Sequence, residues 1–220
     1  MADWATISSL ATAGGTLALA GATYASVRSG NRSARVAEVA LQEQRRPVLV
    51  QSRHDDRGQA VGFADGRRVN IPGGSAAVEA TADAVYLALS VRNVGAGLAV
   101  LQAWRPHSVA GVEPPSDTWR ANVLGEGAPA LEEFRPLTRD QYIAGGDLGL
   151  WQGALRDPGD PLQATLSAAT AERRRFLVDL LYTDQVGGQR TISRFAVLPS
   201  DDGWLTAAAR HWYLDAPAPR

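Results

Sequence analysis

A long uncharged stretch opens the pattern of polar and apolar positions along the 220-residue chain. From Trp4 to Val27 the sequence contains no charged residue, which exceeds the roughly 20 residues that a helix needs to cross a bilayer core. Trp4 and Tyr24 stand 20 positions apart, about 30 Å along a helix, and aromatic rings favour the two membrane interfaces. The pattern therefore predicts a transmembrane helix over residues 1–27, with the lipid bilayer as its partner.

The charges that flank this stretch are asymmetric. Only Asp3 precedes it, whereas Arg28, Arg32 and Arg35 follow it, and arginine is enriched on the cytoplasmic side of membrane spans. We therefore expect these residues at the membrane interface of a single-pass protein of the bacterial cytoplasmic membrane, with the C-terminal domain in the cytoplasm. Two alternatives stay open. One is a cleaved signal peptide, which would need a basic leading region that is missing here; the other is a helix buried in a soluble assembly.

Small residues suggest that this helix associates with copies of itself. Gly14, Ala18 and Ala22 recur every four positions, and stripes of this kind allow two helices to approach closely. The abundance of alanine in the whole chain explains the stripe equally well. Residues 28–46 are polar and rich in good helix formers, so they predict a helical stalk that ends before Pro47.

In the rest of the chain the pattern changes to the alternation that is typical of β-strands. Apolar side chains occupy every second position between residues 85 and 92, which predicts a half-buried strand. Residues 176–183 and 190–198 predict a hairpin, with Gly187 and Gly188 in its turn.

These strands define a second domain over residues 47–216, followed by a tail at 217–220. Strand patterns separated by Gly and Pro turns favour an antiparallel, immunoglobulin-like β-sandwich. Residues 107–161 are rich in Pro, Gly and acidic residues, so we expect long loops there with one or two embedded strands. The pair Asp160-Pro161 is typical of a helix start, which adds one accessory helix.

The segment Arg92–Val100, RNVGAGLAV, has two glycines one residue apart after an apolar run. A dinucleotide-binding loop needs a third Gly or Ala where this chain has Val100, and then a helix, whereas Pro106 follows too soon. Glycines that permit positive φ, next to Asn93, predict a turn between two strands.

Composition removes several classes of function. The formal net charge is −1, so we expect no nucleic-acid partner. All 22 basic residues are arginine, which is typical of a GC-rich bacterial genome, and the absence of cysteine excludes disulfides and thiolate chemistry.

Candidate catalytic and metal-binding residues do not form a recognisable motif. His54, His107 and His211 are far apart in the sequence, and no nucleophile signature is present. The run His54-Asp55-Asp56 contains metal-ligand types but has no spaced partner, so a solvated turn is favoured. We therefore expect no cofactor, no metal and no enzymatic activity.

Aromatic and arginine residues supply the candidate partner-binding surface. Trp119 and Trp151 flank the loop region, where Arg135 and Arg139 also lie. Trp and Arg are the residue types that anchor protein interfaces, although most tryptophans of a sandwich fill its core.

Three stretches carry a resemblance to a known group: the strand-opening Arg46-Pro47, the turn VRNVGAGLA, and the hairpin LLYTDQVGGQRTISRF. Together they resemble uncharacterised bacterial proteins with one N-terminal transmembrane helix and an immunoglobulin-like β domain. The resemblance implies fold and anchoring, and it carries no catalytic residues. The sequence thus predicts a membrane-anchored, non-enzymatic binding or adaptor protein. The alternatives are a structural subunit of a homo-oligomer held by its N-terminal helix, and an enzyme with an unrecognised site.

Overall fold

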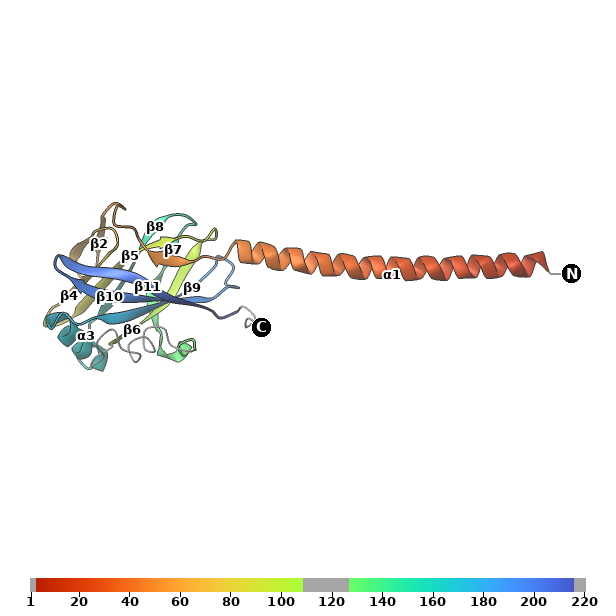
Figure 1. Ribbon diagram of the computed structural model, residues 1–220. Helices are drawn as coiled ribbons and strands as arrows, with labels where there is room; N and C mark the ends of the chain where they lie inside the picture. Colours follow the sequence, from red (N-terminus) through yellow and green to blue (C-terminus); the bar gives the residue numbers. More distant parts are fainter. Residues whose placement is uncertain (1–2, 109–126, 216–220) are drawn as a thin grey trace. The chain divides into compact units, whose positions relative to one another are not determined.

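The chain divides into two units, Met1–Gln44 and Arg45–Arg220. The computed structural model describes residues 3–108 and 127–215, and in residues 4–11 it describes the backbone alone. The first unit consists of one long helix, and the second is a curled antiparallel β-sheet with a short helix, α3 (Figure 1).

Helix α1 spans Trp4–Gln44 without a break, so the Gly30-Asn31 pair does not interrupt it. The hydroxyl of Thr16 donates to the carbonyl of Thr12 at 2.9 Å, which satisfies a polar group that would otherwise compete with the helix. All side chains from Thr12 to Gln44 are exposed. The predicted span and the predicted stalk are therefore one continuous helix, and it ends before Pro47 as expected.

The prediction of a transmembrane anchor is wrong. Among the residues that the structure describes, no helix is long and apolar enough to cross a membrane. The uncharged stretch was long enough, but Ala, Gly, Ser and Thr make up most of it, and these side chains contribute little apolar surface. The same finding corrects the predicted location, which was a single-pass protein of the bacterial cytoplasmic membrane with its C-terminal domain in the cytoplasm.

The second unit is built on one large sheet. Nine strands of the described chain form it. Strand β5 pairs with β4 and, further along, with β1 on one edge, and with β8 on the other edge. From β4 the order continues through β11, β10, β9 and β6 to β7. A separate hairpin consists of β2 (Gln59–Gly62) and β3 (Arg68–Ile71). The strands of the large sheet are β1 (Leu49–Gln51), β4 (Ser75–Ala80), β5 (Val85–Asn93), β6 (Ala99–Ser108), β7 (Arg135–Ile143), β8 (Leu148–Leu155), β9 (Phe176–Thr183), β10 (Thr191–Ser200) and β11 (Gly203–Tyr213).

The sheet curls around a single main core. Strands β4 and β11 are joined by only two residue pairs, Ala76–Trp204 and Ser75–Leu205. The enclosed side chains come from nearly every strand, and Phe195, Trp151 and Tyr182 are fully buried among them. The immunoglobulin-like arrangement that the sequence favoured is not confirmed, because one continuous strand path connects what would be two separate sheets.

Strand β5 shows why alternation alone misjudged burial. Its inward side chains are buried as predicted, with Leu87 and Leu89 each 1% exposed. However, Ala88 and Ser90 on the opposite face are also fully buried. The β2–β3 hairpin packs on that face through Val61, Phe63, Val69 and Ile71. The strand is therefore covered on both faces, rather than half-buried.

Local signals placed other elements accurately. Strand β9 has the predicted bounds, and the turn before β10 contains Gly187 at φ 82°. Helix α3 spans Pro161–Ala171, and the Asp160 side chain caps it by accepting a hydrogen bond from the Leu162 amide at 3.0 Å. Leu166 anchors this helix to the core, where its side chain is fully buried.

The RNVGAG segment is a turn between β5 and β6, as predicted. Asn93 organises it from a fully buried position. Its Oδ1 accepts from the amides of Val48 and Gly95, and its Nδ2 donates to the carbonyls of Gly97 and Ile143, at 2.7–3.1 Å. A Cβ on Gly97 would lie 1.7 Å from the Arg45 carbonyl oxygen, so the glycines serve close chain packing.

Candidate functional site

Strands β7 and β8 are the two ends of the curled sheet. They follow each other in the chain, and near their connecting turn the side chain of Ile143 packs directly over Gly149. Beyond that turn, no ladder joins β7 to β8 in the part of the chain that the structure describes. Each strand therefore presents one open edge toward the other.

A cleft of about 300 Å³ lies between these two strand ends. Strand β7 contributes one wall and strand β8 the other, and the β2–β3 hairpin closes one side. We name it the β7–β8 cleft, and its lining residues are Phe63, Ala64, Trp104, Arg135, Pro136, Leu137, Thr138, Gln152, Gly153, Ala154 and Arg156.

Two tryptophans and a glycine define the aromatic side of the cleft. Trp104 on β6 is 5% exposed and packs against Trp151, with ring centroids 5.0 Å apart. A Cβ on Gly153 would lie 2.7 Å from the Trp151 ring and 3.0 Å from the Trp104 ring. Glycine is therefore the residue that lets β8 lie against both rings while the cleft stays open.

The β7 wall contains a large irregularity. Pro136 pairs with Ala103 and Gln141 pairs with Leu101, so residues 137–140 of β7 lie opposite the single residue 102 of β6. A bulge of this kind bends the strand and leaves its extra residues outside the ladder. Residues Leu137 and Thr138 of the bulge line the cleft.

Two arginines line the cleft, and each contacts a carboxylate. Arg135 forms an ion pair with Asp160. Arg156 contacts Asp65 through Nε and Nη2, both at 3.2 Å. The hydrogen bond from Arg135 lowers the pKa of Asp160, and the pKa of Asp65 is lowered mainly by the hydroxyl of Tyr86. Both carboxylates are therefore ionised at neutral pH.

The predicted partner-binding residues divide between three environments. Arg135 lines the cleft, and Arg139 is exposed in the β7 bulge beside it. Trp151 is fully buried, so the prediction that it contacts a partner directly is corrected: it packs in the core behind the cleft. Trp119 lies outside the described residues.

Sequence reasoning did not single out the other residues of the cleft, although two signals were present. Pro136 cannot donate to a ladder, and proline within a strand is typical of an edge strand. Gly153 inside a strand pattern is typical of a close approach by another group. Neither signal identifies Trp104 or Arg156 as the neighbours that complete the site.

A second polar cluster lies on the face of β9 and β10 that points away from the main core. Asp179 is fully buried and accepts from Arg194 at 2.7 and 2.8 Å, which is a bidentate pair. Arg105 approaches the same carboxylate at 3.4 Å, and His107 Nδ1 at 4.0 Å. Burial lowers the pKa of His107 to about 4, so the ring is neutral at physiological pH. The Asp179 carboxylate is buried and bonded to arginines of the sheet itself, so this cluster is a structural ion pair.

A serine–histidine pair is also present. Ser193 Oγ lies 2.7 Å from His211 Nδ1 and 2.8 Å from the hydroxyl of Tyr182, which in turn accepts from the Leu49 amide. Ser193 and Tyr182 are fully buried, so a substrate has no access to the serine oxygen. This hydrogen-bond chain ties β1, β9, β10 and β11 together.

The three histidines do not share a site. His54 lies in the loop after β1, whereas His107 and His211 lie on β6 and β11. Within residues 3–108 and 127–215, no group of three or more His, Asp or Glu side chains is placed to hold a metal ion.

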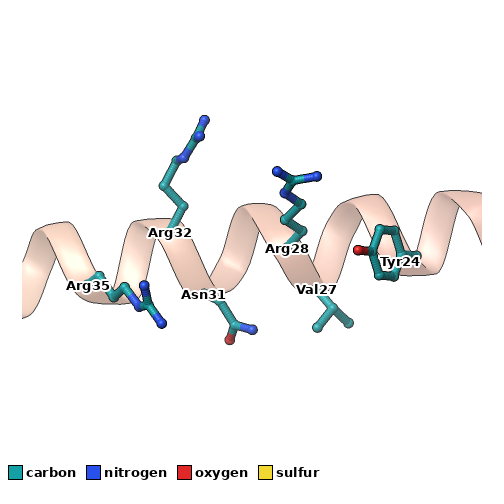
Figure 2. A pocket seen from close by; sticks show the side chains of 6 residues that line it. All are labelled: Tyr24, Val27, Arg28, Asn31, Arg32 and Arg35. Atoms are coloured by element: carbon teal, nitrogen blue, oxygen red, sulfur yellow. The ribbon is translucent and has the colours of Figure 1, made fainter.

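Helix α1 carries a shallow hollow of about 420 Å³. Figure 2 shows Arg28 and Arg32 extending to one side of the helix, and Val27, Asn31 and Arg35 to the other. The sequence placed Tyr24, Arg28, Arg32 and Arg35 at a membrane interface, and all four are among the residues that line this hollow. The side chain of Trp4 is not described. Gly14, Ala18 and Ala22 are exposed along the same helix.

Comparison of the chain with protein-family models and with curated proteins found no match.

Proposed function

We propose that this protein is a non-catalytic binding protein whose β domain captures a protein partner in the β7–β8 cleft. The observation that carries the proposal is a cleft between two open strand edges, with an aromatic side and arginines in its lining. Open strand edges readily accept another chain, and Trp and Arg are the residue types that most often anchor protein interfaces.

The polar clusters outside the cleft are buried, whereas the cleft is open, and this difference favours a binding function over catalysis. The Asp179–Arg194 pair and the Ser193 hydroxyl are fully buried or nearly so, and their partners are other parts of the sheet. A general base or nucleophile must reach its substrate within hydrogen-bond distance. The cleft, in contrast, is open to solvent, and Arg135 and Arg156 there have side chains that are 37% and 45% exposed.

Site-specific photo-cross-linking tests this function. A benzophenone amino acid is placed at Thr138 in the cleft and, as a matched control, at Val186, which is 81% exposed in the β9–β10 turn. We expect a discrete adduct with one protein from position 138 only, and its loss when Ala64→Trp, at an exposed position of the lining, narrows the cleft. Equal adducts from both positions, or none from position 138, would refute the proposal.

A second candidate function is a structural subunit of a homo-oligomer, because α1 buries none of its described side chains. Helices in water depend on packing for most of their stability. Two sets of residues recur every seven positions, as in a coiled coil, and an asparagine at such a position sets the register of the helices. The first set is Leu17, Tyr24 and Asn31, and the second is Ala20, Val27, Ala34 and Leu41.

Sedimentation of the full chain tests this second candidate. We expect a multiple of the chain mass for the wild type, a monomer for Val27→Asp, and no change for Ser29→Asp, which lies off the seven-residue positions. A monomeric wild-type chain would exclude assembly through α1.

A further inference from the structure

The two ends of the curled sheet, β7 and β8, both line the β7–β8 cleft. Strand β8 pairs with β5 through all of its residues, from Leu148 to Leu155, so its opposite edge carries no described ladder. The edge of β7 opposite β6 likewise carries no described ladder. Backbone amides and carbonyls need partners when they are removed from water, and an extended peptide supplies them on both of its sides.

The cleft is small, and part of its lining is apolar, which restricts the side chain that it accepts. Its volume of about 300 Å³ is at the lower end of ligand pockets, so it suits a short segment rather than a folded surface. Trp104, Leu137 and Phe63 provide its apolar lining. Successive side chains of a strand point to opposite faces, so every second residue of the peptide would meet this lining.

The arginines determine the charge of the segment. In the part of the chain that the structure describes, Asp65 engages Nε and Nη2 of Arg156, and Asp160 engages Nη1 of Arg135. Arginine carries five N–H donors, so each guanidinium retains donors for another carboxylate. Arg139 adds a further exposed positive charge next to the cleft. An acidic side chain beside the apolar one complements this lining.

We infer that the β7–β8 cleft binds an extended, acidic peptide segment of a protein partner, which adds a strand between β7 and β8 and places a large apolar side chain against Trp104. This inference rests on the proposed function, because it specifies the chemistry of the same site. It requires main-chain pairing with both edges, which a helical ligand or a folded surface does not provide.

The probe is a random 12-residue peptide library displayed on phage and selected on the full-length protein. We expect selected sequences with large apolar residues at alternate positions and Asp or Glu next to them. Synthetic peptides of these sequences should bind Thr138→Trp at least about tenfold more weakly than the wild type. Val186→Trp, an exposed position in the β9–β10 turn outside the cleft lining, is the matched control and should bind within about twofold of the wild type.

Main-chain pairing is tested with two N-methylated versions of the selected peptide. Methyl groups on alternate amides remove the donors that face one edge, and the shifted series removes those that face the other edge. We expect both series to lose binding. Loss in one series only, loss in neither, or equal binding to the two tryptophan variants would overturn the inference.

The two proposals fail differently. An adduct from position 138 without any cleft-dependent peptide would mean that the partner docks as a folded surface, which overturns the strand inference and keeps the binding function. Peptides that bind the cleft while position 138 yields no adduct in cells would support the strand chemistry and overturn capture of a cellular partner.

Discussion

Replacing Asn93 by alanine should strongly destabilise the β domain. The side chain is fully buried, and it makes four hydrogen bonds to main-chain groups of three separate segments. A typical hydrogen bond contributes about 0.5–1.5 kcal/mol, and a buried partner left without one costs more. Asn93→Ala should therefore lower the free energy of unfolding by about 3–5 kcal/mol.

That loss is a large part of the roughly 5–15 kcal/mol that stabilises an ordinary domain. In a chain of this size it corresponds to a fall in Tm of roughly 10 °C. Urea denaturation followed by tryptophan fluorescence measures the first quantity, and calorimetry the second. The matched control is Val94→Ala, because the Val94 side chain is 56% exposed and its main-chain hydrogen bond to Val48 is retained.

The control should change the free energy of unfolding by less than about 0.5 kcal/mol. Equal losses in the two variants would show that the turn is generally fragile and that the Asn93 side chain has no special role. A loss below about 1 kcal/mol in Asn93→Ala would refute the summation over four hydrogen bonds, because a single hydrogen bond already contributes about that much.

Three further predictions concern packing and pH. Gly97→Ala should prevent stable folding, since its Cβ would collide with the Arg45 carbonyl, whereas Gly188→Ala, with open space around it, should leave urea denaturation unchanged. Gly153→Ala should cost about 1–3 kcal/mol in the same assay, because the added methyl group overpacks two indole rings. The buried His107 has its pKa lowered from 6.5 to about 4, so the unfolded chain binds the proton more tightly. The contribution of neutral His107 to the free energy of unfolding is therefore complete above about pH 6.5, and it is lost as the pH falls toward 4. If the free energy of unfolding of His107→Gln falls as steeply with decreasing pH as that of the wild type, this expectation is contradicted.

Local sequence signals predicted the elements whose conformation depends on near neighbours. Helix α3 begins where Asp160 caps it and Pro161 occupies its first position, and strand β9 begins and ends where the apolar run does. The RNVGAG segment was correctly predicted to be a turn, but the reason given for its glycines was wrong, because neither Gly95 nor Gly97 has a positive φ. Gly97 instead packs against Arg45, and Asn93 bonds Val48 and Ile143, which are all distant in the sequence. The tryptophans show the limit of this reasoning: Trp151 looked like an interface anchor, and its burial depends on β6, which lies some distance away in the sequence.

The N-terminal stretch shows a different limit. Freedom from charge correctly indicated a long helix, since Ala-rich segments favour helical structure. The absence of charge was a poor measure of hydrophobicity, because most residues of this stretch are small and several carry a hydroxyl group. The helix was thus predicted correctly and its membrane role was not.

The sequence by itself determined the N-terminal helix, helix α3, strands β5, β9 and β10 and the β9–β10 turn, because capping, proline and alternation act over a few residues. Only the tertiary structure decided that β7 and β8 are the two ends of the sheet, and that Trp104, Gly153 and Arg156 meet between them. Strand pairing depends on partners that are distant in the sequence, and the pattern within one strand does not specify which neighbour its edge finds. The cleft could not be predicted from the sequence because an open strand edge is a property of the whole sheet.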